Sequence, residues 1–137
     1  MATEWTGLTP YIEVFDMIAS VQFYRNILGF EVVFASPEVV TPEGRFSHFM
    51  RLRLGRAELM LNTAYDSGER PAGRAAQRWR GHSDVAFYID CSDVDAYYDV
   101  LRQKGVEINP PVIAPYGMKF IQVRDPDGYR LQFHMPV

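Results

Sequence analysis

The stretch Asp125-Pro126-Asp127-Gly128-Tyr129-Arg130-Leu131-Gln132-Phe133-His134 decides the fold of this chain. Its first four residues have the chemistry of a tight turn, because Pro126 presets φ and Gly128 tolerates a positive φ. After the turn, Leu131 and Phe133 alternate with polar side chains, which is the period-two pattern of a half-buried strand. The stretch therefore predicts a strand that leaves a tight turn as the second arm of a hairpin.

The first half of the chain contains a matching stretch at residues 54–62, which predicts a second hairpin of the same kind. An offset of 74 residues relates Glu58 to Gln132, and the same offset relates Asp16 to Asp90. This repetition indicates a duplicated module.

Each half shows the same order of predicted elements: a strand, a helix and three further strands. The first helix, 18–28, ends at Gly29, a residue typical of helix C-termini. The second begins at Ser92, with an acidic residue three positions later, and continues to Lys104. The predicted strands are 11–15, 30–34, 48–54 and 57–62 in the first half, and 84–89, 106–108, 118–124 and 129–134 in the second. We therefore expect two βαβββ modules, 8–63 and 83–137, joined by a linker at 64–82.

Two connecting stretches are predicted to be irregular. The first, 36–44, contains Pro and Gly and is interpreted as a loop. The second is the linker, in which Gly and Pro residues accompany Arg70, Arg74, Arg78 and Arg80. We interpret the linker as a solvated connection without regular structure. The alternative is a lid or a partner-contacting arm that is anchored by Trp79.

Composition restricts the class of protein. The 137 residues are 47% hydrophobic, which is enough for one domain with a packed core. The net charge of −3 gives no general attraction for nucleic acid or for an anionic membrane. The single cysteine, Cys91, excludes an internal disulfide and is typical of a reducing cytoplasm. The sequence shows no signal peptide and no membrane-spanning run, so a cytoplasmic domain is expected, with neither nucleic acid nor membrane as a partner.

One layer of helices covers only one face of a sheet, so the other faces of two such sheets can enclose a cavity. The apolar faces, expected beneath the helices, carry Ile12, Val14, Leu59, Leu61, Val85, Phe87, Leu131 and Phe133. The opposite faces either meet solvent or line a partly apolar pocket. The candidate ligand-binding residues on or near these faces are Thr9, Tyr11, Glu13, Glu58, Met60, Asn62, Asp84, Tyr88, Tyr116, Gln132 and His134.

Five short motifs together resemble the vicinal oxygen chelate superfamily, which includes glyoxalase I, bleomycin-binding proteins, fosfomycin-resistance enzymes and extradiol dioxygenases. They are Phe23-Tyr24, Leu28-Gly29-Phe30-Glu31, Ala57-Glu58-Leu59, Gly117-Met118 and Asp125-Pro126-Asp127-Gly128-Tyr129. The resemblance extends over residues 9–136. It implies an α+β fold in which the two βαβββ modules form a curled mixed sheet around a cavity, and it implies a homodimer.

The resemblance also implies where a metal would bind. Enzymes of the superfamily hold a divalent metal with His, Glu or Gln from four strands, and the corresponding positions here are Thr9, Glu58, Asp84 and Gln132. Thr9 and Asp84 replace the usual imidazole or amide ligands, so no metal cofactor is expected. If a metal binds, the expected ligands are the oxygens of Glu58, Asp84 and Gln132, a set that suits a hard ion.

Three functions remain open. The preferred hypothesis is metal-independent binding of a small molecule in a pocket between the modules, as in the antibiotic-resistance members of the superfamily. Carboxylates beside aromatic rings favour a cationic, partly aromatic ligand, whereas anions would be favoured if Arg130 and the linker arginines covered the mouth. The second hypothesis is a metal-dependent lyase, isomerase or dioxygenase with an atypical ligand set. The third is a vestigial pocket in an interaction module.

Overall fold

The computed structural model describes residues 2–137 and divides them into two compact units. Unit 1 comprises the residues up to Ile18 together with Phe30–Arg70, and unit 2 comprises Ala19–Gly29 together with Pro71–Val137. The helical segment that follows the first strand therefore belongs mostly to unit 2, although it comes from the first half of the sequence.

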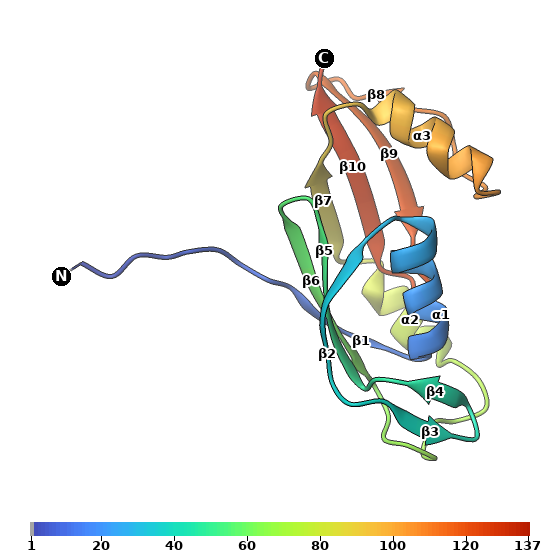
Figure 1. Ribbon diagram of the computed structural model, residues 1–137. Coiled ribbons are helices and arrows are strands. Elements are labelled where there is room, and N and C mark those ends of the chain that lie inside the picture. Colours follow the sequence, from blue (N-terminus) through green and yellow to red (C-terminus); the bar gives the residue numbers. More distant parts are fainter. Residues whose placement is uncertain (1) are drawn as a thin grey trace. The chain divides into compact units, whose positions relative to one another are not determined.

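Unit 1 is built on a four-stranded sheet with the strand order β1-β6-β5-β2 (Figure 1). Its parallel pair joins β1 to β6, and the other two pairs are antiparallel. The bounds are Tyr11–Val14 for β1, Glu31–Ala35 for β2, Phe49–Leu54 for β5 and Ala57–Thr63 for β6. The first predicted hairpin is thus confirmed as β5 and β6.

A small antiparallel hairpin in unit 1 contradicts the prediction of an irregular loop at 36–44. It consists of β3 (Val39–Thr41) and β4 (Gly44–Phe46). The run of β-branched residues in β3 favours a strand, and the Thr41 hydroxyl closes the turn by accepting the N–H of Glu43 at 3.1 Å.

Unit 2 contains the second four-stranded sheet, with the order β7-β10-β9-β8. The bounds are Ala86–Asp90 for β7, Val112–Ile113 for β8, Met118–Arg124 for β9 and Arg130–Pro136 for β10. The second predicted hairpin is confirmed as β9 and β10, which pair along their whole length. Helix α3 (Val94–Gln103) is also confirmed, although its N-cap is Asp93, which accepts the N–H of Ala96, rather than Ser92.

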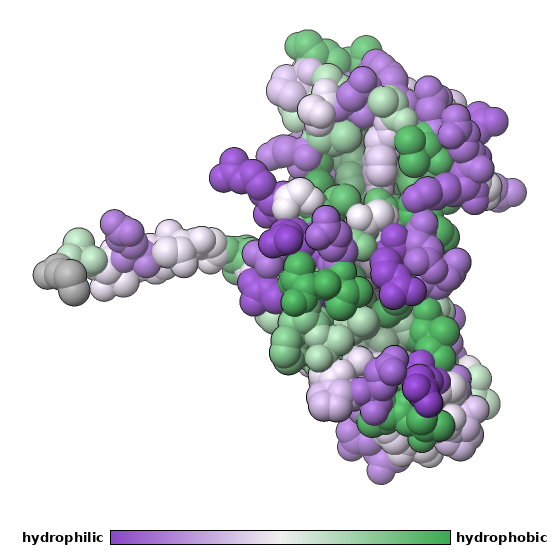
Figure 2. Space-filling view, in the orientation of Figure 1, coloured by the Kyte–Doolittle hydropathy of each residue, from purple (hydrophilic) through white to green (hydrophobic). Residues whose placement is uncertain are grey.

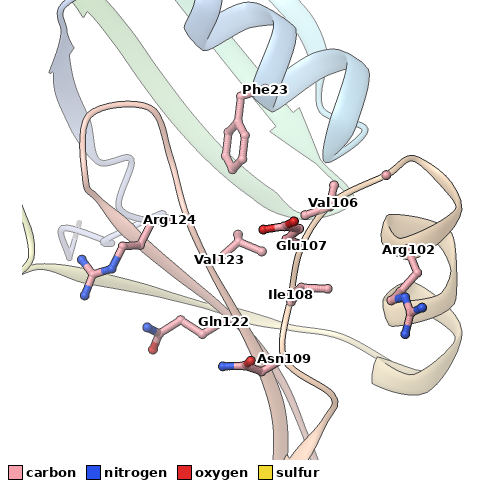
Figure 3. A pocket seen from close by; sticks show the side chains of 10 residues that line it. Phe23, Arg102, Val106, Glu107, Ile108, Asn109, Gln122, Val123 and Arg124 are labelled. Carbon is pink, nitrogen blue, oxygen red and sulfur yellow. The ribbon is translucent and has the colours of Figure 1, made fainter.

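The strand that was predicted at 106–108 lies further along the chain, at β8. Residues 106–110 are irregular, and β8 pairs only with Phe120 and Lys119. Pro110 and Pro111 explain the displacement, because neither has an N–H to donate to a neighbouring strand. A groove of about 830 Å³ lies between β9 and the 105–109 segment, with Phe23 beside it (Figure 3).

The helix predicted at 18–28 is confirmed, but it is an α-helix in its first part and a π-helix in its second. Helix α1 (Met17–Val21) continues directly into the π-helix η1 (Gln22–Ile27), whose wider turn is seen in the hydrogen bond from Leu28 N–H to Phe23 O at 2.9 Å. Two side chains of α3 and its C-terminal end donate to the last carbonyl oxygens of this helical segment. Tyr97 donates to Leu28 O at 2.7 Å, and Lys104 Nζ donates to Asn26 O and Ile27 O. No helix in residues 2–137 combines the length and the apolar character that crossing a membrane requires.

Three hydrogen bonds to the Asp125 carboxylate hold the Asp125–Tyr129 turn in place. One carboxylate oxygen of Asp125 accepts the N–H groups of Asp127 and Tyr129 at 2.9 and 2.8 Å. The other accepts the Tyr24 hydroxyl at 2.7 Å. Asp125 is only 3% exposed. Burial raises the pKa of Asp125 to about 6, although these hydrogen bonds act to lower it.

Helix α2 (Ala76–His82) contradicts the prediction that residues 64–82 lack regular structure. It packs against the same turn: the His82 imidazole stacks on Tyr129 with ring centroids 4.0 Å apart, and Nδ1 donates to Asp127 O at 2.7 Å. Trp79 lies against Gly128. A helix of this length depends on such tertiary contacts rather than on its own sequence, which is why the pattern alone did not indicate it.

The apolar faces lie inside as predicted except in β7 and just before it, where Phe87 is only half-buried and Val85 is exposed. Ile12, Val14, Leu59, Leu61, Leu131 and Phe133 are each at most 4% exposed. Val85 is 43% exposed because β7 begins only at Ala86. Other apolar side chains reach the surface among hydrophilic ones (Figure 2).

The titration of Asp125 predicts a fall in stability with rising pH. A pKa of about 6 in the folded state, against an ordinary 3.8, means that the folded protein holds this proton more tightly than the unfolded chain. Stability should therefore decline between about pH 4 and pH 6 by about 3 kcal/mol and then level off. Urea unfolding across this range should show the decline, and Asp125→Asn should remove it.

In the same measurement, the variant Tyr24→Phe should enlarge the pH dependence that Asp125→Asn removes. Loss of the Tyr24 hydrogen bond removes an interaction that lowers the pKa of Asp125, so the decline should extend to higher pH than in the unmodified protein. Identical pH profiles for all three proteins would contradict the assignment to Asp125.

Gly128 is predicted to be intolerant of a methyl group. Its φ is +87°, and an added Cβ would lie 2.7 Å from Trp79 O. Gly105 is the matched control, because its φ is +83° but no atom lies within 4 Å of the added Cβ. Gly105→Ala should cost about 1 kcal/mol from backbone strain alone, and Gly128→Ala should cost clearly more. Equal losses in chemical unfolding would show that the Trp79 contact is unimportant.

Candidate functional site

The open face of the first sheet brings together most candidate residues of the first half. In the register of β1 and β6, Tyr11 lies beside Met60 and Glu13 lies beside Asn62. The Tyr11 hydroxyl donates to Glu13 at 3.4 Å. Partial burial, followed by the negative charge of Glu13, raises the pKa of Tyr11. These side chains therefore form one continuous surface opposite the buried face of unit 1.

Arg51 joins two of the predicted positions and was missed by the sequence interpretation. Its Nε donates to Glu58 Oε1 at 2.9 Å, and its Nη2 donates to Thr9 Oγ1 at 3.2 Å. The hydrogen bond from Arg51 lowers the pKa of Glu58, and the charges of Arg51 and Arg53 act in the same direction. The alternation of side chains within β5 could have indicated this role. Because the neighbouring Leu52 is buried, Arg51 points to the opposite, open face.

An aromatic pair extends this face and was also missed. The rings of Phe34 and Phe49 are 5.9 Å apart, and Phe34 lies opposite Arg51 in the pairing of β2 with β5. Phe34 is 57% exposed and Tyr11 is 49% exposed. The face therefore offers ring surfaces beside charged groups, which is the composition of a small-molecule site.

The second sheet gathers a second group of predicted residues on the face opposite Leu131 and Phe133. Gln132 lies opposite Tyr88 in the pairing of β10 with β7, and His134 lies opposite Asp90. His134 Nε2 is 2.9 Å from Asp90 Oδ1, and its ring meets Tyr88 edge-on at 5.3 Å. Gln132 is buried at 4% exposure. Asp90, which was not among the candidates, orients the imidazole of His134.

Asp84 and Tyr116 stand apart from this group. Asp84 is exposed and precedes β7, and its N–H donates to Gly81 O at 3.1 Å. The residue that lies opposite Gln132 is therefore not Asp84 but Tyr88, which is on β7. The predicted strand began too early because α2 extends to His82. Tyr116 lies in the turn before β9 and is 67% exposed.

Within each unit, the positions that the resemblance associates with a metal make other contacts. Among residues 2–137 no group of three or more His, Cys, Asp and Glu residues is arranged to hold a metal ion. The Glu58 carboxylate is already bonded to a guanidinium, and Asp84 does not lie beside Gln132.

A protein-family model matches the sequence of this chain, and several solved structures match its fold. The model of the Glyoxalase/Bleomycin resistance protein/Dioxygenase superfamily matches residues 9–133, and the chain therefore belongs to that superfamily. The resemblance predicted from the five motifs and the α+β fold with mixed sheets are confirmed.

The similar structures from Streptomyces include an antibiotic-binding protein and a bleomycin-binding protein. TnmS3, an antibiotic-binding protein from Streptomyces sp. CB03234, is 21% identical with a TM-score of 0.66, over 99% of this chain and 100% of its own. The bleomycin-binding protein of bleomycin-producing Streptomyces verticillus, complexed with copper(II)-bleomycin, is 20% identical with a TM-score of 0.66, over 96% of this chain and 97% of its own.

A superfamily member from Sphaerobacter thermophilus DSM 20745 is 26% identical with a TM-score of 0.61, over 92% of this chain and 93% of its own. No match is found among curated proteins.

The ion pair of Arg51 with Glu58 makes a testable electrostatic prediction. In Arg51→Gln, the pKa of Glu58 should rise towards its ordinary value, because the hydrogen bond that lowers it most is weakened. Arg53→Gln is the control and should produce a smaller rise, since Arg53 acts through its charge alone. Carboxyl titration by NMR measures both, and equal rises would contradict the hydrogen-bonded geometry.

Proposed function

We propose that this protein binds a small, cationic and partly aromatic molecule without a metal, on the open face of its first sheet. The cluster of Thr9, Arg51 and Glu58 carries the proposal. By resemblance, Thr9 and Glu58 occupy positions that contribute metal ligands in the superfamily's enzymes. Here a guanidinium bonds to both side chains. Its positive charge repels a divalent cation from the carboxylate that the cation would need.

The remaining side chains of this face support a cationic ligand. Exposed ring surface comes from Tyr11 and Phe34, while Met60 lies beside Tyr11. Glu13 sits beside Tyr11, so a carboxylate and an aromatic ring can contact one positive group together. We assign the main attraction for the ligand's positive charge to Glu13, because its carboxylate lies beside the exposed ring of Tyr11.

Relatives support a small-molecule role related to antibiotic resistance. TnmS3 is described as antibiotic-binding, and the Streptomyces verticillus protein as bleomycin-binding. The second sheet contributes its own polar and aromatic group of Tyr88, Gln132 and His134. That the pocket lies between the modules, and that the protein is a homodimer, stay predictions.

Calorimetric titration with a matched pair of ligands tests the proposal. An aromatic quaternary amine and a carboxylate built on the same ring system differ mainly in charge. We expect the amine to bind more tightly, and Glu13→Gln to weaken it about tenfold, a loss of about 1.4 kcal/mol. Arg130→Gln, on the second sheet, should leave the affinity for the amine unchanged. Tighter binding of the carboxylate would reverse the assignment.

Metal dependence is tested on the same preparations. We expect ligand affinity to be insensitive to a chelator. Stoichiometric Zn, Ni, Fe or Mn in the purified protein, lost in Glu58→Ala, would instead favour the metal-dependent lyase, isomerase or dioxygenase.

A further inference from the structure

A hydrogen-bonded chain of three side chains lies at one end of the β5–β6 hairpin in unit 1. His48 Nε2 is 2.7 Å from the hydroxyl oxygen of Ser67, and His48 Nδ1 is hydrogen-bonded to the hydroxyl of Thr63. Thr63 follows Asn62 on β6, so these side chains belong to the opposite face from the proposed binding surface. The arrangement resembles that of a nucleophile, a base and a group that orients the base.

The imidazole of His48 is held from several sides. Its backbone carbonyl accepts the N–H of Thr63 at 2.9 Å, which ties it to the hairpin. The ring of Phe46 meets the imidazole edge-on at 5.2 Å. When the Nδ1 proton is donated to Thr63, the lone pair of Nε2 is left to accept the proton of Ser67.

Ser67 is presented to solvent by a tight turn. The turn is closed by the N–H of Glu69, which donates to Asp66 O at 3.0 Å, and Gly68 has a φ of +78°. The N–H of Gly68 donates to no other group within residues 2–137. The N–H of the residue after a nucleophile is a recurring donor to the oxyanion in acyl transfer.

We propose that Ser67, His48 and Thr63 form an acyl-transfer site for activated carboxylic esters with a small acyl group. Ser67 is the nucleophile, His48 is the general base, and Thr63 is a positioning residue. An ester with a good leaving group is required, because the site is exposed and Gly68 supplies only one oxyanion donor. The ring of Phe46 beside the imidazole favours an aryl ester.

The reaction balances without a co-reactant other than water. Ser67 Oγ forms a bond to the carbonyl carbon while its proton passes to His48 Nε2. The bond from that carbon to the aryl oxygen breaks, and the leaving oxygen takes the proton from Nε2. Water then adds to the acyl carbon, gives a proton to Nε2, and Ser67 Oγ leaves with that proton as the carboxylic acid is released.

Hydrolysis of p-nitrophenyl acetate by the full chain tests the site. We expect nitrophenol release together with an acetyl group that mass spectrometry maps to Ser67. Ser67→Ala should abolish both, whereas Ser92→Ala, at another exposed serine, should change neither. His48→Gln should slow acetylation of Ser67 by roughly 100-fold or more, the usual contribution of a general base.

Variants of Thr63 distinguish a positioning role of this residue from a purely structural one. Thr63→Val should lower kcat about tenfold, the effect of losing one neutral hydrogen bond, with KM nearly unchanged. Thr63→Ser keeps the hydroxyl and should restore kcat. Thermal unfolding of every variant checks that the fold is retained.

Three results would overturn the proposal. The first is nitrophenol release that Ser67→Ala leaves unchanged. The second is acetylation confined to lysines and the chain terminus. The third is no detectable acetylation of Ser67 in the folded protein, which would make the three hydroxyl and imidazole groups a structural link between the hairpin and the turn.

Discussion

The hydrogen bond between Tyr24 and Asp125 is the constraint on which unit 2 depends. It joins side chains 101 positions apart in the sequence, at the helical segment and at the turn before β10. A carboxylate buried to this extent is unfavourable unless its oxygens accept hydrogen bonds. Asp125 meets that requirement with one hydroxyl and two backbone N–H groups, and the same bonds define the turn. Helix α2 then packs on the turn through His82, so one polar anchor organises three segments.

Burial of one face of the first sheet leaves exposed aromatic side chains on its other face. In unit 1 the available face carries acids and rings, but its character depends on Arg51. Without that side chain, Glu58 would lack its hydrogen-bonded guanidinium at a position that the resemblance associates with metal binding. With it, the carboxylate and Thr9 are tied to a cation of the protein itself. In the proposed function, a single residue on a neighbouring strand would thereby determine which ligands the face attracts.

Long periodic elements were predictable, whereas the short elements α2, β3 and β4 were not. The hairpins β5–β6 and β9–β10 follow from alternation over many residues, and their buried faces agree with the sequence pattern. Helix α2 is brief and stabilised by its contacts with the Asp125–Tyr129 turn, so local propensity carries little signal. The start of β7 was misjudged for the same reason, and that error placed Asp84 on the strand.

The sequence by itself determined the family, the repeated order of the main elements and the face to which most strand residues point. Those properties depend on local period and on turn residues, which a single chain displays directly. Only the tertiary structure decided which side chains meet. Arg51 reaches Glu58 because their strands are neighbours, and Ser67 reaches His48 because a turn returns the chain to the hairpin. Alternation assigns a residue to a face, but strand order, register and loop path select its partners, and these are set by packing across the whole unit.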